Sequence, residues 1–317
     1  MTRFGVESAG RPGVLCDTYP TNVGGMTRLC VVGSVNLDLS LGVDALPRPG
    51  ETVLASSLTH TPGGKGGNQA VAAARAGATV QFVGALGDDA AAGRLRSHLE
   101  ANGVGLDGAV EIPGPSGTAI VVVDAHAENT IVVAPGANGR FTLSDERART
   151  VVGDCDVMLT QLEIPVPTAV AAAHHARSAG AVVVVNASPA GQDPGSLGDL
   201  AAAADVVITN EEEADEWPWR PEHLVVTLGA HGARYVGADG EYTVPAPTVT
   251  AVDTAGAGDV FAGVLAANWP PNPGSADQRR LALQRACAAG ALATLVAGAG
   301  DCAPDAQSIA KALRGAS

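Results

Sequence analysis

The clearest pattern along the chain is a series of short, continuous apolar runs that end at glycine or a polar residue. Such runs are typical of strands buried on both faces, in a parallel sheet covered by helices. Amphipathic or alanine-rich stretches separate them, so we predict a doubly wound α/β core with a mostly parallel sheet and helices on both faces. The predicted strands lie at 29–33, 80–83, 157–162, 182–186, 206–209 and 224–228, and the predicted helices at 68–76, 90–101, 168–179, 211–216 and after Gly258 and Ser275.

Other segments alternate between apolar and polar residues, which predicts strands with one exposed face. Residues 118–123 and 130–133 form a hairpin-like pair of this kind. Residues 38–43 alternate as well, and residues 52–59, after a proline-glycine turn, continue the same sheet element. We therefore predict a small β-sheet appendage, assembled from about residues 38–60 and 115–135.

Composition indicates an ordinary globular protein whose core is built largely from Ala, Val and Leu. Of 317 residues, 46% are hydrophobic, 16% are charged and only 3% are aromatic, so one large α/β domain with an appendage is expected. The net charge of −14 argues against nucleic acid or an anionic membrane as partner, because both need a basic face. A nucleotide can still bind if its charge is met locally by backbone N–H groups, a few cations and a metal.

The ends of the chain and its cysteines suggest a cytoplasmic protein. Residues 1–27 are rich in Gly, Pro, Ser and Thr and lack an apolar signal-peptide core, so we expect a disordered extension. Met26 directly precedes the first strand and is an alternative start. The longest small-apolar run is too short to span a membrane. The scattered cysteines form no C-x-x-C pair, which favours a reducing compartment; they are Cys16, Cys30, Cys155, Cys287 and Cys302.

The segment 253–259, Asp-Thr-Ala-Gly-Ala-Gly-Asp, is the strongest candidate for chemistry. Its small residues leave backbone N–H groups almost uncovered, and a stretch that predicts a buried helix follows. A bare turn at a helix start attracts anions, because unpaired N–H groups and the helix dipole point to the same place. Asp259 lies in the first turn of that helix, where a carboxylate can act as the base in phosphoryl transfer to a hydroxyl. A glycine-rich turn without function is the alternative.

Polar residues near the ends of other elements extend this site. Asn36 and Asp38 follow the first strand, at the edge where α/β proteins bind ligands, and can bind vicinal sugar hydroxyls; an Asx-turn is the alternative. Lys65 and Asn68 enter a helix start among four glycines, at 63, 64, 66 and 67. That setting favours close approach of a ligand over a plain turn with a helix cap.

Two later strands also end in polar groups. Glu163 follows the strand at 157–162 and faces the same edge of the sheet. Asn210 and Glu213 follow the strand at 206–209 and can organise Mg²⁺-bound water and phosphate, or simply cap an acidic helix. The chain contains no P-loop motif, no complete dinucleotide fingerprint and no zinc-binding spacing of histidines.

Together these segments resemble the PfkB carbohydrate kinase family. Residues 62–77, Pro-Gly-Gly-Lys-Gly-Gly-Asn-Gln and onward, are similar to its first signature, and residues 253–263 to its second. The resemblance covers about residues 28–310 through shorter matches at 33–38, 47–52, 133–138, 161–165 and 226–232. It implies a doubly wound core with a β-sheet lid and ATP-dependent phosphorylation of ribose at its 5-hydroxyl, which gives ribose 5-phosphate and ADP.

The resemblance also implies a role for individual residues. Asp259 is the base, and the backbone of Gly256, Ala257 and Gly258 forms an anion hole. The implied ribose ligands are Asn36, Asp38, Gly64, Lys65, Asn68 and Glu163, with Asp259 beside them. The implied ATP site is formed by Asn210, Thr227, Gly229, Gly232, Gly258 and Cys287, with Glu213 binding Mg²⁺ through water.

A monovalent cation, usually K⁺, activates members of this family, and a homodimer formed through the lid is common among them. The implied cation ligands are Asp253, Ala255, Ala293, Val296, Gly298 and Cys302. The chain departs from the family at Cys302, where serine is usual, and at Cys287, where asparagine or histidine is common. The segment between Glu213 and His223 is also shorter than usual, which suggests that a peripheral helix is lost.

Other functions remain open at this stage. The acceptor could be deoxyribose, fructose or a nucleoside such as adenosine, or the chain could be a non-catalytic regulator that binds a sugar or nucleotide. The polar set Asn36, Asp38 and Glu163 favours free ribose, because a nucleoside base would need an apolar or aromatic shelf under the lid. A regulator would be expected to have lost Asp259 or the glycines beside it, and both are present.

Overall fold

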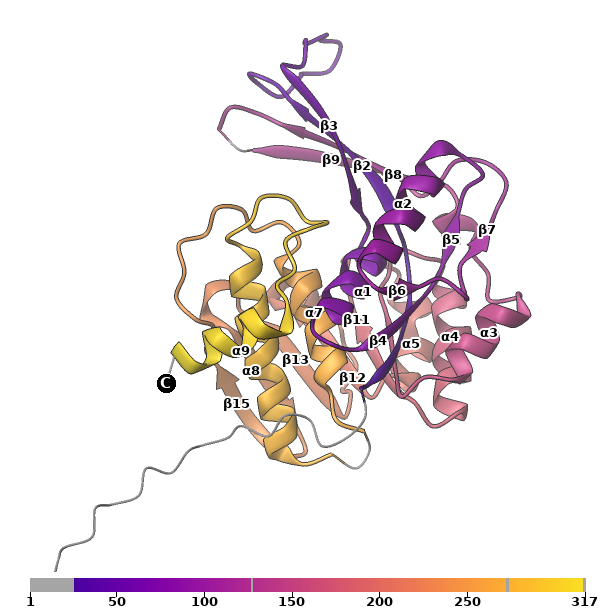
Figure 1. Ribbon diagram of the computed structural model, residues 1–317, viewed down its shortest axis with the longest axis vertical. Coiled ribbons are helices and arrows are strands. Elements are labelled where there is room, and N and C mark those ends of the chain that lie inside the picture. Colours follow the sequence, from indigo (N-terminus) through magenta and orange to yellow (C-terminus); the bar gives the residue numbers. More distant parts are fainter. Residues whose placement is uncertain (1–25, 127, 272–273, 316–317) are drawn as a thin grey trace, which may run out of the picture.

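The computed structural model describes residues 26–315, apart from residues 127 and 272–273. Most of the predicted N-terminal extension and Cys16 therefore lie outside the described residues. Thr27 already belongs to the folded body, because its carbonyl accepts a 3.0 Å hydrogen bond from the N–H of Thr79. A layered α/β body with an arm of β-strands above it makes up the molecule (Figure 1).

The central sheet confirms the predicted α/β core. Its nine strands, counted over the described residues, follow the order β15-β14-β13-β12-β11-β10-β1-β4-β6. The strands from β13 to β6 run parallel, and β14 and β15 form an antiparallel edge. The bounds are β1 Arg28–Val32, β4 Thr79–Val83, β6 Val104–Gly105, β10 Val157–Thr160, β11 Val182–Asn186, β12 Val206–Asn210, β13 His223–Thr227, β14 Ala233–Gly237 and β15 Gly240–Val244.

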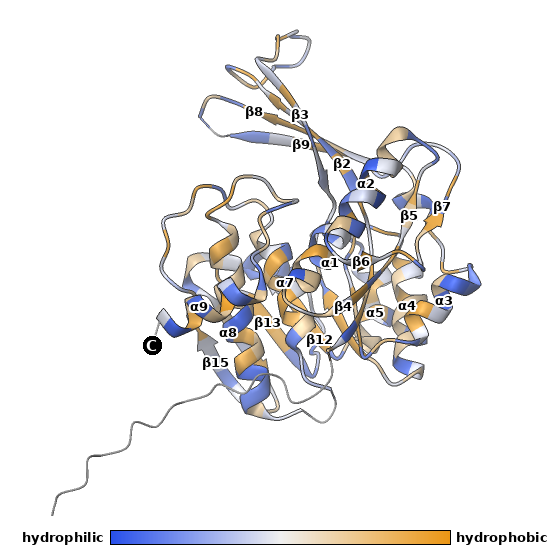
Figure 2. Ribbon diagram, viewed as in Figure 1, coloured by the Kyte–Doolittle hydropathy of each residue, from blue (hydrophilic) through white to orange (hydrophobic). Residues whose placement is uncertain are grey.

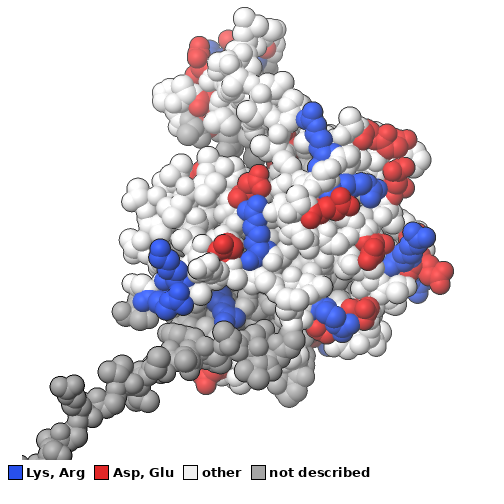
Figure 3. All heavy atoms as spheres, viewed as in Figure 1, with Lys and Arg blue, Asp and Glu red and all other residues white. Residues whose placement is uncertain are grey.

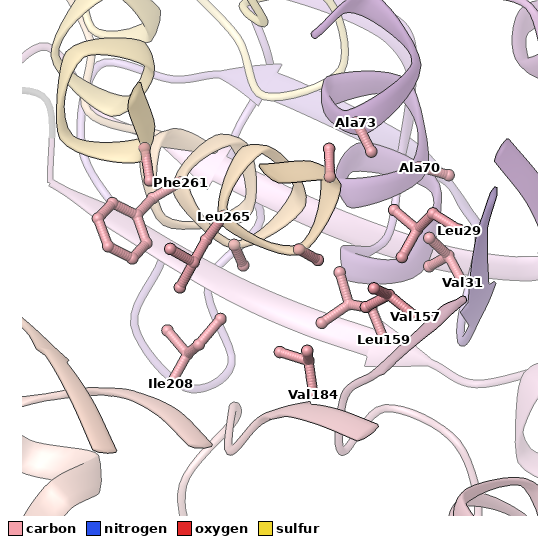
Figure 4. Close-up of a cluster of buried hydrophobic side chains, with 14 of the residues drawn as sticks. Leu29, Val31, Ala70, Ala73, Val157, Leu159, Val184, Ile208, Phe261 and Leu265 are labelled. Carbon is pink, nitrogen blue, oxygen red and sulfur yellow. The ribbon is translucent and has the colours of Figure 1, made fainter. Parts of the chain in front are cut away.

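Helices cover both faces of this sheet because its side chains alternate between two buried layers. In β1, Leu29 and Val31 pack with α1, α2, α7 and α8, whereas Cys30 and Val32 pack with α3, α4 and α5. Figure 4 shows the first layer, where Phe261 and Leu265 lie over the strand side chains. The helices are α1 Lys65–Arg75, α2 Ala90–Ala101, α3 Glu146–Gly153, α4 Val166–Ser178, α5 Pro194–Ala203, α6 Glu211–Glu216, α7 Ala257–Asn268, α8 Ala276–Ala293 and α9 Ala306–Gly315.

The predicted appendage is a separate four-stranded sheet, which we call the lid. Its order is β3-β2-β8-β9, from β3 Ser57–Gly63, β2 Asn36–Gly42, β8 Gly117–Val123 and β9 Asn129–Ala134. The hairpin of β8 and β9 is antiparallel, as predicted. The lid projects from the body above the ends of the core strands (Figure 1), and Figure 2 shows hydrophobic and hydrophilic residues mixed along it. A smaller sheet pairs β5 Ala85–Leu86 with β7 Val110–Glu111.

Two parts of the fold differ from the prediction or lie beyond it. The helix predicted at 68–76 begins at Lys65, because the N–H of Asn68 already bonds to the carbonyl of Gly64, four residues before it. Glycines 66 and 67 therefore lie inside the first helical turn. The patterns did not indicate α3, α5, α9 or the edge strands β14 and β15.

Two features of the surface can be described. No helix of the described residues is long and apolar enough to cross a bilayer. On the face of the molecule in Figure 3, acidic and basic side chains are interspersed, without a continuous basic patch on that face.

Candidate active site

The candidate residues converge where the parallel strands end. Glu163 follows β10, Asn210 ends β12 and Thr227 ends β13. The start of α7 lies at the same edge, since Asp259 and Thr227 line one cavity. This is the edge at which open α/β sheets bind ligands.

The loop before α7 is held in an anion-binding shape by Asp253. One oxygen of this carboxylate accepts the N–H of Ala255 at 2.9 Å, and the other accepts the N–H of Gly298 at 2.8 Å. Gly256 then adopts a left-handed conformation with φ 77° and begins the helix without a side-chain cap. The first N–H groups of a helix have no intrahelical partner. That of Ala257 bonds to the carbonyl of Thr254 at 3.3 Å, whereas those of Gly256 and Gly258 bond to no described carbonyl and are available to an anion.

Asp259 lies in the first turn of α7 and is only 8% exposed. Its oxygens accept hydrogen bonds from Asn68 Nδ2 and Gln69 Nε2, each at 3.0 Å. The ammonium of Lys65 lies 4.0 Å from the same carboxylate. A buried carboxylate with amide donors on both oxygens and a cation beside it is held in one orientation.

A second polar cluster lies under the lid and contains the predicted sugar ligands. Glu163 accepts hydrogen bonds from Ser34 Oγ at 2.5 Å and from the N–H of Lys65 at 3.0 Å. Asn36 is 4% exposed, and its side-chain oxygen accepts a bond from Asn138 Nδ2 at 2.8 Å. Gly64 is packed tightly here, because a Cβ on it would lie 2.8 Å from the backbone nitrogen of Asn36.

Asp38 in this cluster is unusual, because its oxygen Oδ1 is buried without a hydrogen-bond partner among the described residues. Burial, followed by the nearby charges of Glu163 and Asp259, raises the pKa of Asp38 to about 7. A Cβ on Gly63 would lie 2.1 Å from the other oxygen, so the glycine leaves space for this carboxylate. An unsatisfied buried acceptor is costly, and a ligand hydroxyl would satisfy it.

Two adjoining cavities extend from Asp259 over the carboxyl edge. The inner cavity, about 170 Å³, is lined by Lys65, Asp259 and the glycines of the loop together with Asn210 and Glu213. The outer cavity, about 390 Å³, is lined by Gly229, Gly232, Cys287 and mainly apolar groups. Thr227 and Gly258 line both cavities. Charged groups at one end and an apolar space at the other suit the phosphates and the base of a nucleotide.

Asn210 and Glu213 form a capping box as well as lining the inner cavity. Glu213 Oε2 accepts the N–H of Asn210 at 2.9 Å, and Asn210 Oδ1 accepts the N–H of Glu213 at 2.7 Å. The capped acidic helix is therefore present, with Glu213 contributing to the cavity wall. The described residues contain no cluster of three or more His, Cys, Asp or Glu that could hold a metal. Asn210 and Glu213 therefore fit a magnesium ion that is held mainly by phosphate and water.

The predicted cation ligands lie behind the α7 loop. Cys302 is buried, and its Sγ lies 3.3 Å from the carbonyl of Ala299 and 3.8 Å from that of Ala255. Burial raises the pKa of this thiol, so its S–H remains a donor to these carbonyls at neutral pH. The carbonyl of Ala293 accepts the N–H of Val296 in the turn after α8. Carbonyl oxygens suit K⁺, whereas the thiol is a poor ligand for a hard cation.

Sequence reasoning missed several polar residues of the site. Gln69 bonds to Asp259, Asn186 lines the inner cavity and Asn138 fixes Asn36. Gln161 supports Gln69 through a 2.6 Å bond from its Nε2. Asn186 ends an apolar strand and Gln161 immediately follows one, which was the signal available to find them.

This fold and site define a phosphotransferase of the α/β class. The family described as pfkB family carbohydrate kinase matches residues 26–306, and the chain belongs to this family. The chain is 37% identical to a ribokinase from Bacillus subtilis over 74% of its own length and 83% of the relative. It is 32% identical to a deoxyribokinase from Salmonella typhimurium over 75% and 84% of the two chains.

Solved structures give the same result. The structure of Arabidopsis thaliana ribokinase complexed with ribose and ATP superposes with a TM-score of 0.81 at 28% identity. The match covers 91% of this chain and 99% of that one. The predicted ribokinase-like fold is therefore confirmed.

Proposed function

We propose that the protein catalyses ATP-dependent phosphorylation of D-ribose at the 5-hydroxyl, giving D-ribose 5-phosphate and ADP. The observation that carries this proposal is that Asp259 lines the inner cavity and also lies beside the polar cluster under the lid, since Lys65 is 4.0 Å from Asp259 and donates its N–H to Glu163 at 3.0 Å. A sugar hydroxyl on one side and a phosphate on the other would both lie beside the carboxylate of Asp259. Relatives named ribokinase support the choice of sugar.

In this mechanism Asp259 accepts the proton of the 5-hydroxyl while that oxygen attacks the terminal phosphorus of ATP. The backbone N–H groups of Gly256, Ala257 and Gly258 stabilise the charge on the transferred group, and Lys65 adds positive charge. Asn210 and Glu213 would hold magnesium-bound water, and the metal would neutralise phosphate charge when bound. Asn68 positions the base through its 3.0 Å bond to Oδ2.

The outer cavity fits the adenine. The described residues that line it include Phe261, Val249 and Cys287, and none of them carries a charged side chain. We assign Thr227, Gly229 and Gly232 to ATP binding, since all three line this cavity. A monovalent cation, K⁺, bound to carbonyls of the loops at 253–255 and 293–302 would fix the shape of the anion hole, although Cys302 weakens one ligand position.

The acceptor and the cation are tested together by measuring ADP release. We expect turnover with ribose and Mg²⁺, stimulated by K⁺, in a panel that also contains deoxyribose, fructose and adenosine. Faster turnover with another acceptor would reassign the substrate. Binding of ribose without turnover of any acceptor would instead support a regulator. The lid contains no Phe, Tyr or Trp in its described strands, which disfavours a nucleoside.

We assign the protein to the cytoplasm, and its four described cysteines are free. We also propose a homodimer formed through the lid. All residues of the edge strand β9 are exposed, including Ile131 and Val132, and an exposed apolar edge strand favours pairing with another strand. Sedimentation velocity at micromolar concentration should show a dimer, and a monomer alone would contradict this assignment.

The activity should depend on pH through Asp38. Its pKa is raised to about 7, so lowering the pH through that value protonates Asp38 in the free enzyme and removes an acceptor for sugar hydroxyls. We expect kcat/KM for ribose to be full above pH 7 and to decline below it, because kcat/KM reports the free enzyme. In Asp38→Asn this decline should disappear and kcat/KM should be low throughout. A flat wild-type profile across this range would contradict the assignment.

A further inference from the structure

We infer that Gln69, with Gln161 behind it, is a positioning residue that fixes the orientation of the base Asp259. Gln69 is fully buried in α1 and is not among the residues that line the inner or outer cavity. Its Nε2 donates to Asp259 Oδ1 at 3.0 Å and to Asn186 Oδ1 at 2.9 Å. One amide therefore bridges the start of α7 and the end of β11. This inference rests on the proposed role of Asp259.

The charge of Asp259 determines the orientation of the whole chain of amides. An ionised carboxylate can only accept hydrogen bonds, so Gln69 must turn its NH₂ group toward Asp259. The oxygen of Gln69 then faces away and accepts Gln161 Nε2 at 2.6 Å. The oxygen of Gln161 is left buried with no partner among the described residues. An unpaired buried acceptor is destabilising, which favours a functional reason for this order of amides.

Asn186 fixes the other end of the bridge. Its Nδ2 donates to the carbonyl of Ile208 at 3.2 Å, so its oxygen faces Gln69. Asn186 and Asp259 both line the inner cavity, on β11 and α7 respectively. Gln69 therefore links two walls of the space assigned to the reacting phosphate.

The packing of α1 against α7 explains why a glutamine reaches this carboxylate. A Cβ on Gly263 would lie 2.3 Å from the backbone oxygen of Gln69, so the two helices are in backbone contact there. Asp259 is four residues before Gly263 and lies on the same face of α7. The close contact at Gly263 thus brings Asp259 next to Gln69.

The proposal is tested with Gln69→Met, which keeps the length of the side chain and removes its amide. We expect kcat for ribose to fall roughly 10–100-fold with KM for ribose and ATP changed less than about threefold, because a misplaced base affects the chemical step. Gln81→Met is the matched control, since Gln81 also bonds a carboxylate, that of Asp107, at 3.0 Å, on the strand β4 that pairs with the edge strand β6. Its kcat should equal that of the wild type.

A purely structural role is excluded by combining the variant with Asp259→Asn. Without the base, Gln69→Met should change the remaining kcat by less than about twofold, since the two residues act as a unit. An undiminished effect in that background, or a folded Gln69→Met with wild-type kcat, would overturn the inference.

If Gln69→Met does not fold, Gln69→Glu keeps the shape and the bond from Gln161 but turns an oxygen toward Asp259. We expect kcat to fall at least as far, and wild-type kcat in this variant would also overturn the inference. Wild-type turnover of ribose is measured in the same series. Its absence would refute the proposed substrate, whereas wild-type turnover without an effect of the variants would refute only the role of Gln69.

Discussion

Asp259→Asn is expected to lower kcat for ribose phosphorylation by roughly 10³-fold, within the range found for loss of a general base. Asparagine keeps the volume of the side chain but cannot accept the proton of the 5-hydroxyl. Its NH₂ group would also face one of the donors, Asn68 or Gln69, that now bond the carboxylate at 3.0 Å. KM for ATP should change less than kcat, because Asp259 lines the inner cavity assigned to the phosphates but not the outer cavity assigned to the adenine.

The measurement is steady-state ADP release over a range of ribose and ATP concentrations, with Asp277→Asn as the matched control. Asp277 occupies the first turn of α8, as Asp259 does in α7, but it is exposed. The control should retain wild-type kcat and separate loss of the base from loss of a helix-start charge. If Asp259→Asn kept more than about a tenth of wild-type kcat, the residue would not be the base.

The fold could be predicted largely because its strands are buried on both faces. Residues 182–185 are a continuous run of valine, and tertiary contacts reinforce what this local pattern already favours. α5 was missed because Pro194–Ala203 contains a proline and glycines, which weaken a helical pattern that burial of Leu197 and Leu200 stabilises. β14 and β15 are short and partly exposed, so their alternation is weak. They are defined by the antiparallel pairing of β14 with β13 and of β15 with β14.

The site was predictable to the extent that its residues carry local signals. Gly256 and Asp259 lie in one short segment, whose sequence shows both the small residues that leave the backbone uncovered and the carboxylate. The role of Gln69 could not be predicted in this way, because nothing in the local sequence around a helical glutamine indicates that its side chain makes a buried contact. Its bond to Asp259 joins residues 190 apart in sequence and depends on the close packing of α1 and α7. Such support for a catalytic group is determined by tertiary packing.

Gly256→Ala is the second change for which we expect a large effect. Gly256 has φ 77°, and a Cβ on it would lie 2.7 Å from the Cα of Ala299. The added methyl group cannot be accommodated unless the loop moves away from Ala299, and the N–H groups after residue 256 would turn with it. Loss of a donor to the developing charge typically costs about 10²–10³-fold in kcat, and we expect a reduction of this size.

Gly180→Ala separates this effect from backbone strain. Gly180 has φ 91° and follows α4 on the outside of the body, where no described residue beyond its chain neighbours comes within 4 Å of the position that a Cβ would take. Both variants should lose about 1–2 kcal/mol of unfolding free energy from the backbone, since alanine is disfavoured in the left-handed region, and Gly256→Ala should lose more because of its contact with Ala299. Only Gly256→Ala should lose kcat, because only there does the methyl group displace the anion-binding turn. Equal kcat in the two variants, measured beside urea denaturation, would mean that the turn tolerates displacement and that the charge is stabilised elsewhere.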